Sequence, residues 1–228
     1  MSPASPMRQE VELIRRRLRR NLSWQAAFVG ERGNGKSTLM LQMARAIDPD
    51  FTIRRVTWNT ADTIRIASQV PKFSVIVQDE GAPSKRRSMS RDNVGMVDFF
   101  ATFREFNVCV FVARPELQEF DPAIVRTMNR IYNVLEVGRV RAETVRKSQF
   151  YSGWRLNTVW DARFPQYSHM LTPEDYETYR QAKDSKLRMH GRSLPGQMGD
   201  AMEKAKDALR DTVNSRVKQF IPGIRWFP

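Results

Sequence analysis

Short apolar runs alternate with stretches of helical spacing through residue 138 of the chain. The apolar runs predict strands at residues 26–29, 51–58, 73–77, 108–113 and 131–137. The helical spacing predicts helices at residues 8–20, 38–47, 60–69, 90–105 and 122–128. Strands that are nearly continuous apolar runs are typical of a parallel sheet buried on both faces. The pattern therefore predicts an α/β fold, with a mainly parallel central sheet flanked by helices.

The pattern changes after Gly138. Residues 145–151 and 154–160 flank Ser152-Gly153 and predict a β-hairpin. Residues 172–186 predict a helix with Thr172 as its cap. We therefore expect four parts: a basic N-terminal helix (1–22), an α/β core (23–140), a hairpin and helix extension (141–189), and a linker at 190–199 followed by an amphipathic helix and an aromatic tail (190–228 in all).

A glycine-rich turn joins the first expected strand to the helix that follows it. Residues 30–37 read Gly-Glu-Arg-Gly-Asn-Gly-Lys-Ser and fit the pattern G-x-x-x-x-G-K-S/T. The backbone amides of such a loop, with the N-terminus of the next helix, bind phosphate. We expect Lys36 to reach the β- and γ-phosphates of ATP and the Ser37 hydroxyl to ligate Mg²⁺. The expected nucleotide-binding residues are Gly30, Glu31, Arg32, Gly33, Asn34, Gly35, Lys36, Ser37 and Thr38.

An acidic pair, Asp79-Glu80, follows the apolar run at 73–77. An aspartate at a strand end is suited to hold Mg²⁺, and an adjacent glutamate to polarise the attacking water. Alone, the pair would fit an ordinary acidic loop; beside the glycine-rich motif it predicts Mg²⁺-dependent ATP hydrolysis. Gln78 stands where an apolar residue is usual.

The charge is strongly basic. Lysines and arginines number 38 against 25 acidic residues, giving +13, and they cluster at residues 15–20 and 85–91. Clustering of this kind favours a polyanionic partner: nucleic acid in first place, an anionic membrane surface in second. A solvated charged face is the alternative for either cluster.

Other classes of protein are disfavoured. The single cysteine, Cys109, permits no internal disulfide, and two histidines beside it make a structural zinc site unexpected. No apolar run approaches the ~20 residues of a membrane span, and no signal peptide is expected. A cytoplasmic setting follows from the cysteine usage.

Residues 24–138 resemble the ATPases of the FtsK–HerA superfamily. The resemblance rests on the glycine-rich motif, the acidic pair, the basic loop after it, and a strand ending at Arg114-Pro115. It is nearest to the genome-packaging ATPases of tailless, membrane-containing double-stranded DNA viruses. It implies a P-loop NTPase of the additional-strand, catalytic-glutamate type with strand order 5-1-4-3-2. Many members carry a polar sensor, often Gln, where this chain has Arg114.

The resemblance also implies a function. Such proteins form rings of identical subunits that move double-stranded DNA at the expense of ATP. The implied partners are DNA, further copies of the chain, and capsid or portal-vertex proteins. The implied location is the host cytoplasm or the virion.

Ring ATPases of this kind insert an arginine into the site of a neighbouring subunit. The candidates are Arg104, Arg114, Arg126 and Arg130, each of which could instead be a solvated surface residue. Arg126 and Arg130 rank first because they lie on, and just beyond, the short helix after the fourth strand. The expected catalytic set is therefore Lys36, Glu80, Arg126 and Arg130.

Two other functions fit the same motifs. One is an ATPase for virion assembly or secretion that acts on protein, similar to the Zot-like ATPases of filamentous phages, which usually carry a membrane segment. The other is a nucleotide-dependent switch or small-molecule kinase, with residues 85–91 as a lid. The acidic pair favours water as the acceptor over a kinase substrate.

Overall fold

The computed structural model describes residues 5–79, 106–147, 154–164 and 172–192. The chain divides into two compact units, Met1–Tyr179 and Arg180–Pro228. The first contains the sheet and its helices; the described part of the second is the remainder of one helix, to Arg192. The basic loop at 85–91, the expected helices at 90–105 and 200–220, and the aromatic tail lie outside the described residues.

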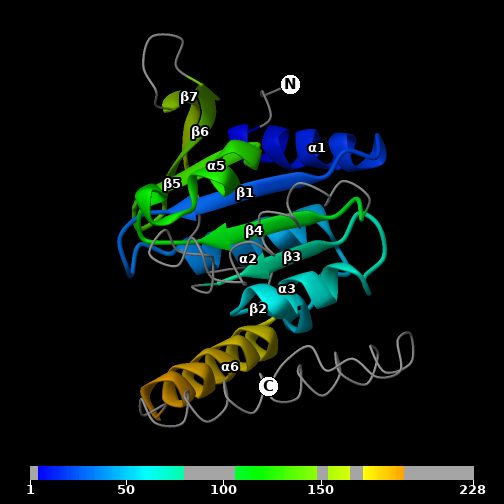
Figure 1. Cartoon of the computed structure of the whole chain (residues 1–228), viewed down its shortest axis with the longest axis vertical. Helices are drawn as coiled ribbons and strands as arrows, with labels where there is room; N and C mark the ends of the chain where they lie inside the picture. The colour runs from blue at the N-terminus through cyan, green and yellow to red at the C-terminus, as the bar shows by residue number, and fades with distance from the viewer. Residues whose placement is uncertain (1–4, 80–105, 148–153, 165–171, 193–228) are drawn as a thin grey trace, which may run out of the picture. The chain divides into compact units, whose positions relative to one another are not determined.

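A seven-stranded sheet forms the centre of the first unit, in the order β2-β3-β4-β1-β5-β6-β7 (Figure 1). The strands are β1 Trp24–Val29, β2 Val56–Thr57, β3 Val75–Gln78, β4 Cys109–Ala113, β5 Arg130–Glu136, β6 Arg139–Lys147 and β7 Trp154–Arg163. Strands β1 to β5 are parallel, whereas β6 and β7 continue the sheet antiparallel. The predicted order 5-1-4-3-2 is confirmed for the parallel part.

Helices cover both faces of this sheet. They are α1 Pro6–Arg19, α2 Lys36–Ile47, α3 Thr60–Ala67 and α5 Pro122–Thr127, with short 3-10 turns at Ile53–Arg55 and Leu117–Glu119. A further helix, α6 Pro173–Arg192, follows β7 in the chain. Ile14 of α1 and Leu39 of α2 belong to one core cluster. Ile64 of α3 and Ile124 of α5 belong to the cluster on the opposite face. Figure 1 shows α3 and α5 in front of the sheet and α2 behind it.

The second expected strand is much shorter than predicted. Only Val56–Thr57 pairs with the sheet, and Ile53–Arg55 forms a 3-10 turn instead. The cause is Asp48, at the end of α2, whose carboxylate accepts from the Asp50 amide at 3.0 Å and forms an ion pair with Arg55. These contacts hold the segment in a turn, although its composition favours a strand.

The predicted antiparallel pair is present, with β6 and β7 paired from Arg139↔Arg163 to Lys147↔Trp154. Its first strand begins six residues earlier than expected, and the expected turn at Ser152-Gly153 lies outside the described residues. Strand β6 starts directly after the turn at Gly138, where φ is 83°, so it joins the same sheet as the parallel strands. The expected boundary between residues 140 and 141 therefore falls inside a strand. Helix α6 is capped by Thr172 as predicted, but it continues to Arg192, into the expected linker.

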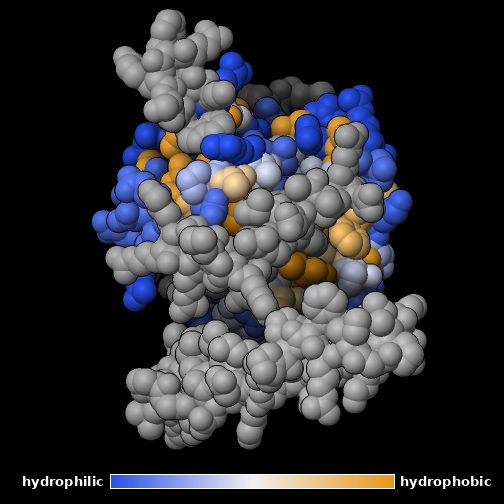
Figure 2. Space-filling view, viewed as in Figure 1, coloured by the Kyte–Doolittle hydropathy of each residue, from blue (hydrophilic) through white to orange (hydrophobic). Residues whose placement is uncertain are grey.

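The described surface is largely polar. Figure 2 shows hydrophilic residues over much of the described part of this face, with smaller hydrophobic areas between them. Within the described ranges, no helix is both long enough and apolar enough to cross a membrane.

Candidate nucleotide site

The loop between β1 and α2 has the backbone of a phosphate-binding turn. Gly30, Gly33 and Gly35 have φ angles of 136°, 90° and 90°, which side chains disfavour. A Cβ built on Gly30 would lie 2.2 Å from the carbonyl oxygen of Val134, so this position has no room for a side chain. The glycines of the motif are therefore required by the shape of the loop.

Neighbouring strand ends fix the loop in place. The Gly30 amide donates to the carbonyl of Pro115, just beyond β4, at 2.8 Å. The Asn34 side chain donates to the carbonyl of Leu135 in β5 at 3.2 Å. The loop therefore lies at the carboxyl end of the parallel strands, where ligands bind in open α/β sheets.

Lys36 folds back over this loop. Its Nζ donates to the carbonyl oxygens of Gly30 at 2.6 Å and Glu31 at 2.8 Å. The ammonium that was predicted to contact phosphate therefore lies at the loop, beside the N-terminus of α2.

Ser37 and Asp79 meet across the end of the sheet. The Ser37 hydroxyl lies 3.1 Å from each carboxylate oxygen of Asp79. Val75 and Val77 of β3 face the cluster that contains α2, so alternation along the chain places Asp79 on that same face. The amide of Asp79 donates to the Thr57 carbonyl at 2.9 Å and fixes the residue at the strand end.

These two side chains fit Mg²⁺. The ion prefers oxygen ligands and is commonly held by one or two carboxylates together with substrate phosphates. Ser37 and Asp79 supply a hydroxyl and a carboxylate, with the Lys36 ammonium beside them to contact phosphate. In the part of the chain that the structure describes, no group of three or more His, Cys, Asp or Glu residues is arranged to hold a metal by itself.

Two aromatic residues of the extension reach this site, and the sequence analysis identified neither. The Tyr179 hydroxyl, from α6, donates to Oδ2 of Asp79. The Phe164 ring, after β7, lies 3.7 Å from a Cβ built on Gly35. No motif marks either residue, because their proximity to the loop arises only from the path of the chain after the sheet.

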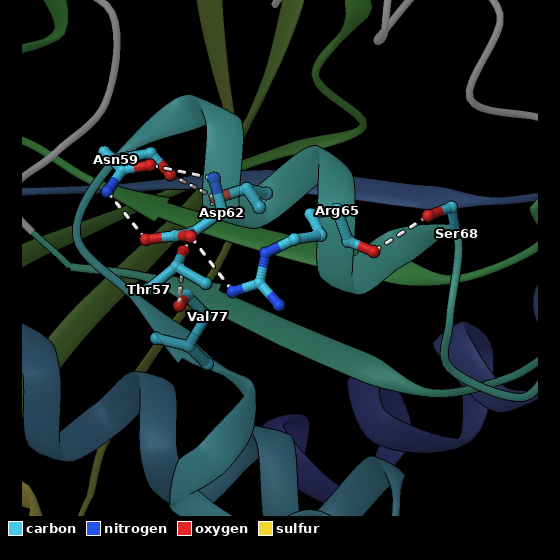
Figure 3. Close-up of polar contacts among 7 residues, drawn as sticks. Thr57, Asn59, Asp62, Arg65, Ser68 and Val77 are labelled. Carbon is cyan, nitrogen blue, oxygen red and sulfur yellow. Dashed lines mark hydrogen bonds and ion pairs between the residues drawn. The ribbon is translucent and has the colours of Figure 1, made fainter.

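The unusual Gln78 has a structural explanation. Its side chain is fully buried and its Oε1 accepts from the Thr63 hydroxyl of α3 at 3.1 Å. Thr63 also contacts the Thr57 hydroxyl at 2.7 Å. Figure 3 shows Thr57 bonded to the Val77 carbonyl beside the first turn of α3. A polar residue at this strand end is therefore matched by polar partners on the helix.

Arg130, predicted to reach the site of a neighbouring subunit, is buried in an ion pair within the chain. Its guanidinium is buried and donates to both carboxylate oxygens of Glu10 in α1, through Nε at 2.6 Å and Nη2 at 3.1 Å. Tyr132 and Trp160 also donate to Glu10, at 2.9 and 3.1 Å. Burial, reinforced by the Glu10 charge, raises the pKa of Tyr132 well above its usual value. Arg130 therefore lies buried within its own chain. To reach the site of a neighbouring subunit, it would first have to break its ion pair with Glu10.

The remaining arginine candidates differ in exposure. Arg126 is exposed on α5, while Arg114 is half-buried and lies 3.6 Å from Glu119. Arg104 and the expected catalytic Glu80 lie outside the described residues. Arg126 is therefore the described candidate whose position suits a contact with a second subunit.

The N-terminal arginine cluster is partly used within the fold. Arg15 donates to the Ala46 and Ile47 carbonyls at the end of α2, at 2.6 and 3.1 Å. Arg17 stacks on Trp24 at 5.6 Å. Arg19 pairs with Glu12 at 2.7 Å in an exposed contact. The other exposed arginines of this segment are Arg8, Arg16 and Arg20.

Comparison with known proteins gives only distant structural similarity. No family model and no curated protein matches the chain. Among solved structures, the N-terminal domain of zonular occludens toxin from Neisseria meningitidis matches at 16% identity and a TM-score of 0.39, over 68% of this chain and 97% of that one. The VirB11 ATPase of the Brucella suis type IV secretion system, in complex with sulphate, matches at 11% identity and a TM-score of 0.32, over 75% of this chain and 61% of that one.

A chain of the HORMA:CdnC:Trip13 complex from E. coli MS115-1 matches at 13% identity and a TM-score of 0.35, over 48% of this chain and 47% of that one. This chain thus spans about half the length of that chain. The strand order, the glycine-rich loop and the lysine folded over it show that the protein has an α/β P-loop NTPase fold.

Proposed function

We propose that this protein is a Mg²⁺-dependent ATPase. The observation that carries the proposal is the 3.1 Å contact between Ser37 and Asp79, which unites two motifs 42 residues apart. A hydroxyl and a carboxylate at this place, beside a phosphate-binding loop and its lysine, form the arrangement that phosphoryl transfer from a nucleotide requires.

In this proposal each group of residues has a separate role in binding or hydrolysis. The loop amides and Lys36 hold the phosphates, and Ser37 and Asp79 hold the metal. Bound Mg²⁺ supplies neutralisation of the charge on the β- and γ-phosphates. Glu80, next in the chain to Asp79, orients and polarises the attacking water.

We further propose that hydrolysis moves double-stranded DNA, with the chain working as a ring that packages a viral genome. The net charge of +13 supports a polyanionic substrate, as does the group of exposed arginines on and after α1. In this proposal the ring acts in the host cytoplasm, with capsid or portal-vertex proteins as further partners. Arg126 is the arginine donated between subunits.

Nucleotide binding and hydrolysis test the first part. Lys36→Ala should lose productive ATP binding, because the phosphates lose their cation. Glu80→Gln should bind Mg²⁺ and ATP but hydrolyse roughly 10²–10⁴-fold more slowly. Lys72→Ala, which removes an exposed lysine before β3, serves as the matched control and should behave like the unchanged protein. Normal turnover by Lys36→Ala would refute the proposal.

Double-stranded DNA tests the second part. We expect it to raise the ATPase rate and to bind without sequence preference. Binding should weaken steeply with salt, because lysines and arginines release condensed counterions. Neutralising Arg8, Arg16 and Arg20 together should reduce that salt slope. No binding at low salt would exclude DNA as the substrate and direct the search to a protein substrate, as in assembly or secretion.

A further inference from the structure

We propose that Tyr179 competes with Mg²⁺ for Asp79 and so sets the metal concentration at which nucleotide binds. The inference rests on the proposed function, since it concerns the same metal site. It assigns a role to a residue that lies 100 positions after Asp79 and outside every motif.

The contacts around the Asp79 carboxylate carry the argument. Oδ2 accepts from Ser37 and from Tyr179, and Oδ1 accepts from Ser37. The single proton of the Ser37 hydroxyl is shared between the two oxygens, so Tyr179 supplies a separate proton at Oδ2. Asp79 is 1% exposed and Tyr179 is 5% exposed, so the hydroxyl is one of the groups that separate this carboxylate from solvent.

A metal held at Ser37 requires the same carboxylate, either directly or through its water shell. Ser37 can keep donating to Asp79 while its oxygen lone pairs face a metal, because donor and acceptor functions of a hydroxyl are separate. The Tyr179 proton lies on the same carboxylate, and a cation that draws on the charge of that carboxylate makes it a weaker acceptor for Tyr179. Binding of the metal therefore displaces Tyr179 or weakens its hydrogen bond.

The position of Tyr179 makes this competition a link between the site and the extension. Helix α6 begins in a regular cap, in which the Asp175 amide donates to the Thr172 hydroxyl at 3.1 Å. Tyr179 lies one turn further and packs in the cluster that contains α2, whereas Tyr176 is 45% exposed. Because coupling between two equilibria is reciprocal, metal binding favours release of Tyr179, and a partner that draws Tyr179 away favours metal binding.

The test is a Mg²⁺ titration of nucleotide binding in the full chain. The probe is a fluorescent, non-hydrolysable ATP analogue, and the measured quantity is the Mg²⁺ concentration at half-maximal binding. Tyr179→Phe keeps the ring and removes the donor, so this concentration should fall about tenfold, as expected for one hydrogen bond to a charged group. Tyr176→Phe, on the exposed side of the same helix, should match the unchanged protein.

A higher Mg²⁺ requirement in Tyr179→Phe would mean that Tyr179 orients Asp79 for the metal, and would overturn the proposal. An unchanged requirement would overturn it equally. Absence of Mg²⁺-dependent binding in the unchanged protein would instead refute the proposed function itself, and this inference with it.

A second measurement does not depend on how the variant folds. With 3-fluorotyrosine placed at position 179 alone, the ¹⁹F resonance should shift when Mg²⁺ and the analogue are added together. The analogue with EDTA should leave the resonance in place. A resonance that does not respond to Mg²⁺ and the analogue would show that the hydroxyl stays where it is, and would overturn the competition.

Discussion

Gly30 and Gly33 share a backbone that disfavours side chains, but their surroundings differ. A Cβ at Gly30 meets a backbone oxygen of β5, whereas a Cβ at Gly33 has no atom within 4 Å. Since backbone yields less readily than a flexible side chain, only the first substitution forces the loop or the strand to move. The two positions separate the effect of strain from the effect of a clash.

We therefore expect Gly30→Ala to be the more damaging substitution. It should lower the free energy of unfolding by several kcal/mol and abolish nucleotide binding. Gly33→Ala should cost only about 1–2 kcal/mol of backbone strain and retain part of the binding. Chemical denaturation and nucleotide titration of both variants check this. Equal losses would show that the close contact with Val134 is unimportant.

Glu143 on β6 is a buried acid with a predictable pH response. It is 8% exposed and lies at the register shift between β6 and β7. Burial raises the pKa of its carboxyl group, against smaller lowering effects of Arg141 and Asn133. The charged form is therefore disfavoured in the folded protein, and this cost is present above the folded pKa and absent below the unfolded one.

Glu143→Gln should raise the melting temperature by a few degrees at neutral pH. The gain should shrink as the pH falls through the raised pKa toward the usual glutamate value of about 4.3, because the unchanged protein is then protonated. Glu136→Gln, on the exposed side of β5, is the control and should change little at any pH. A gain that grows at low pH would contradict the assignment.

At the scale of the elements, a buried carboxylate of α1 bonds to the sheet, beside the apolar packing of Ile14 and Leu18. Glu10 accepts from Arg130 and Tyr132 on β5 and from Trp160 on β7, so it joins the N-terminal helix to two strands at once. Replacing one partner of a buried ion pair leaves the other charge uncompensated.

Glu10→Gln should accordingly destabilise the protein by about 3 kcal/mol. Glu12→Gln, which breaks the exposed pair with Arg19 on the same helix, should cost under about 1 kcal/mol. Urea denaturation of the two variants compares them directly. If Glu10→Gln were as mild as Glu12→Gln, Arg130 would have an alternative partner and its role would have to be reconsidered.

The elements also show what a sequence can and cannot predict. The backbone of the loop glycines and the meeting of Lys36, Ser37 and Asp79 at one end of the sheet were predictable, because local motifs mark these residues. The strand order followed from the family resemblance. The turn at Ile53–Arg55 was missed because Asp48, outside the segment, determines it.

The contacts of Arg130 and Tyr179 were missed for a similar reason. Each contact joins residues 100 or more positions apart. The sequence marked Arg130 and Asp79, but nothing in its spacing or composition marked their partners, Glu10 and Tyr179. Glu10 lies in a helix that was predicted as a basic helix, so nothing in the sequence indicated its buried carboxylate.

At the scale of the whole molecule, the proposed ring makes hydrolysis depend on a neighbour. Mixing two inactive proteins, Glu80→Gln and Arg126→Ala, should restore activity where an intact site faces an intact arginine. An arginine supplied in trans is worth on the order of 10³–10⁵ in rate. Arg130→Ala is the control: its main effect should be on stability, because Arg130 pairs with Glu10. No rescue, with a specific rate independent of protein concentration, would indicate a self-sufficient monomer.

The Glu10 contacts also have a consequence for how the protein is made. Arg130, Tyr132 and Trp160 follow Glu10 by 120, 122 and 150 residues. At translation rates of about 5–20 residues per second, the ribosome takes roughly 8–30 seconds to supply the last of them. Helix α1 is thus synthesised well before the strands that supply the partners of its buried carboxylate. During that interval the arginines of α1 emerge beside ribosomal RNA, which is a polyanion. Glu10, the buried acid of the same helix, does not yet have its full set of partners.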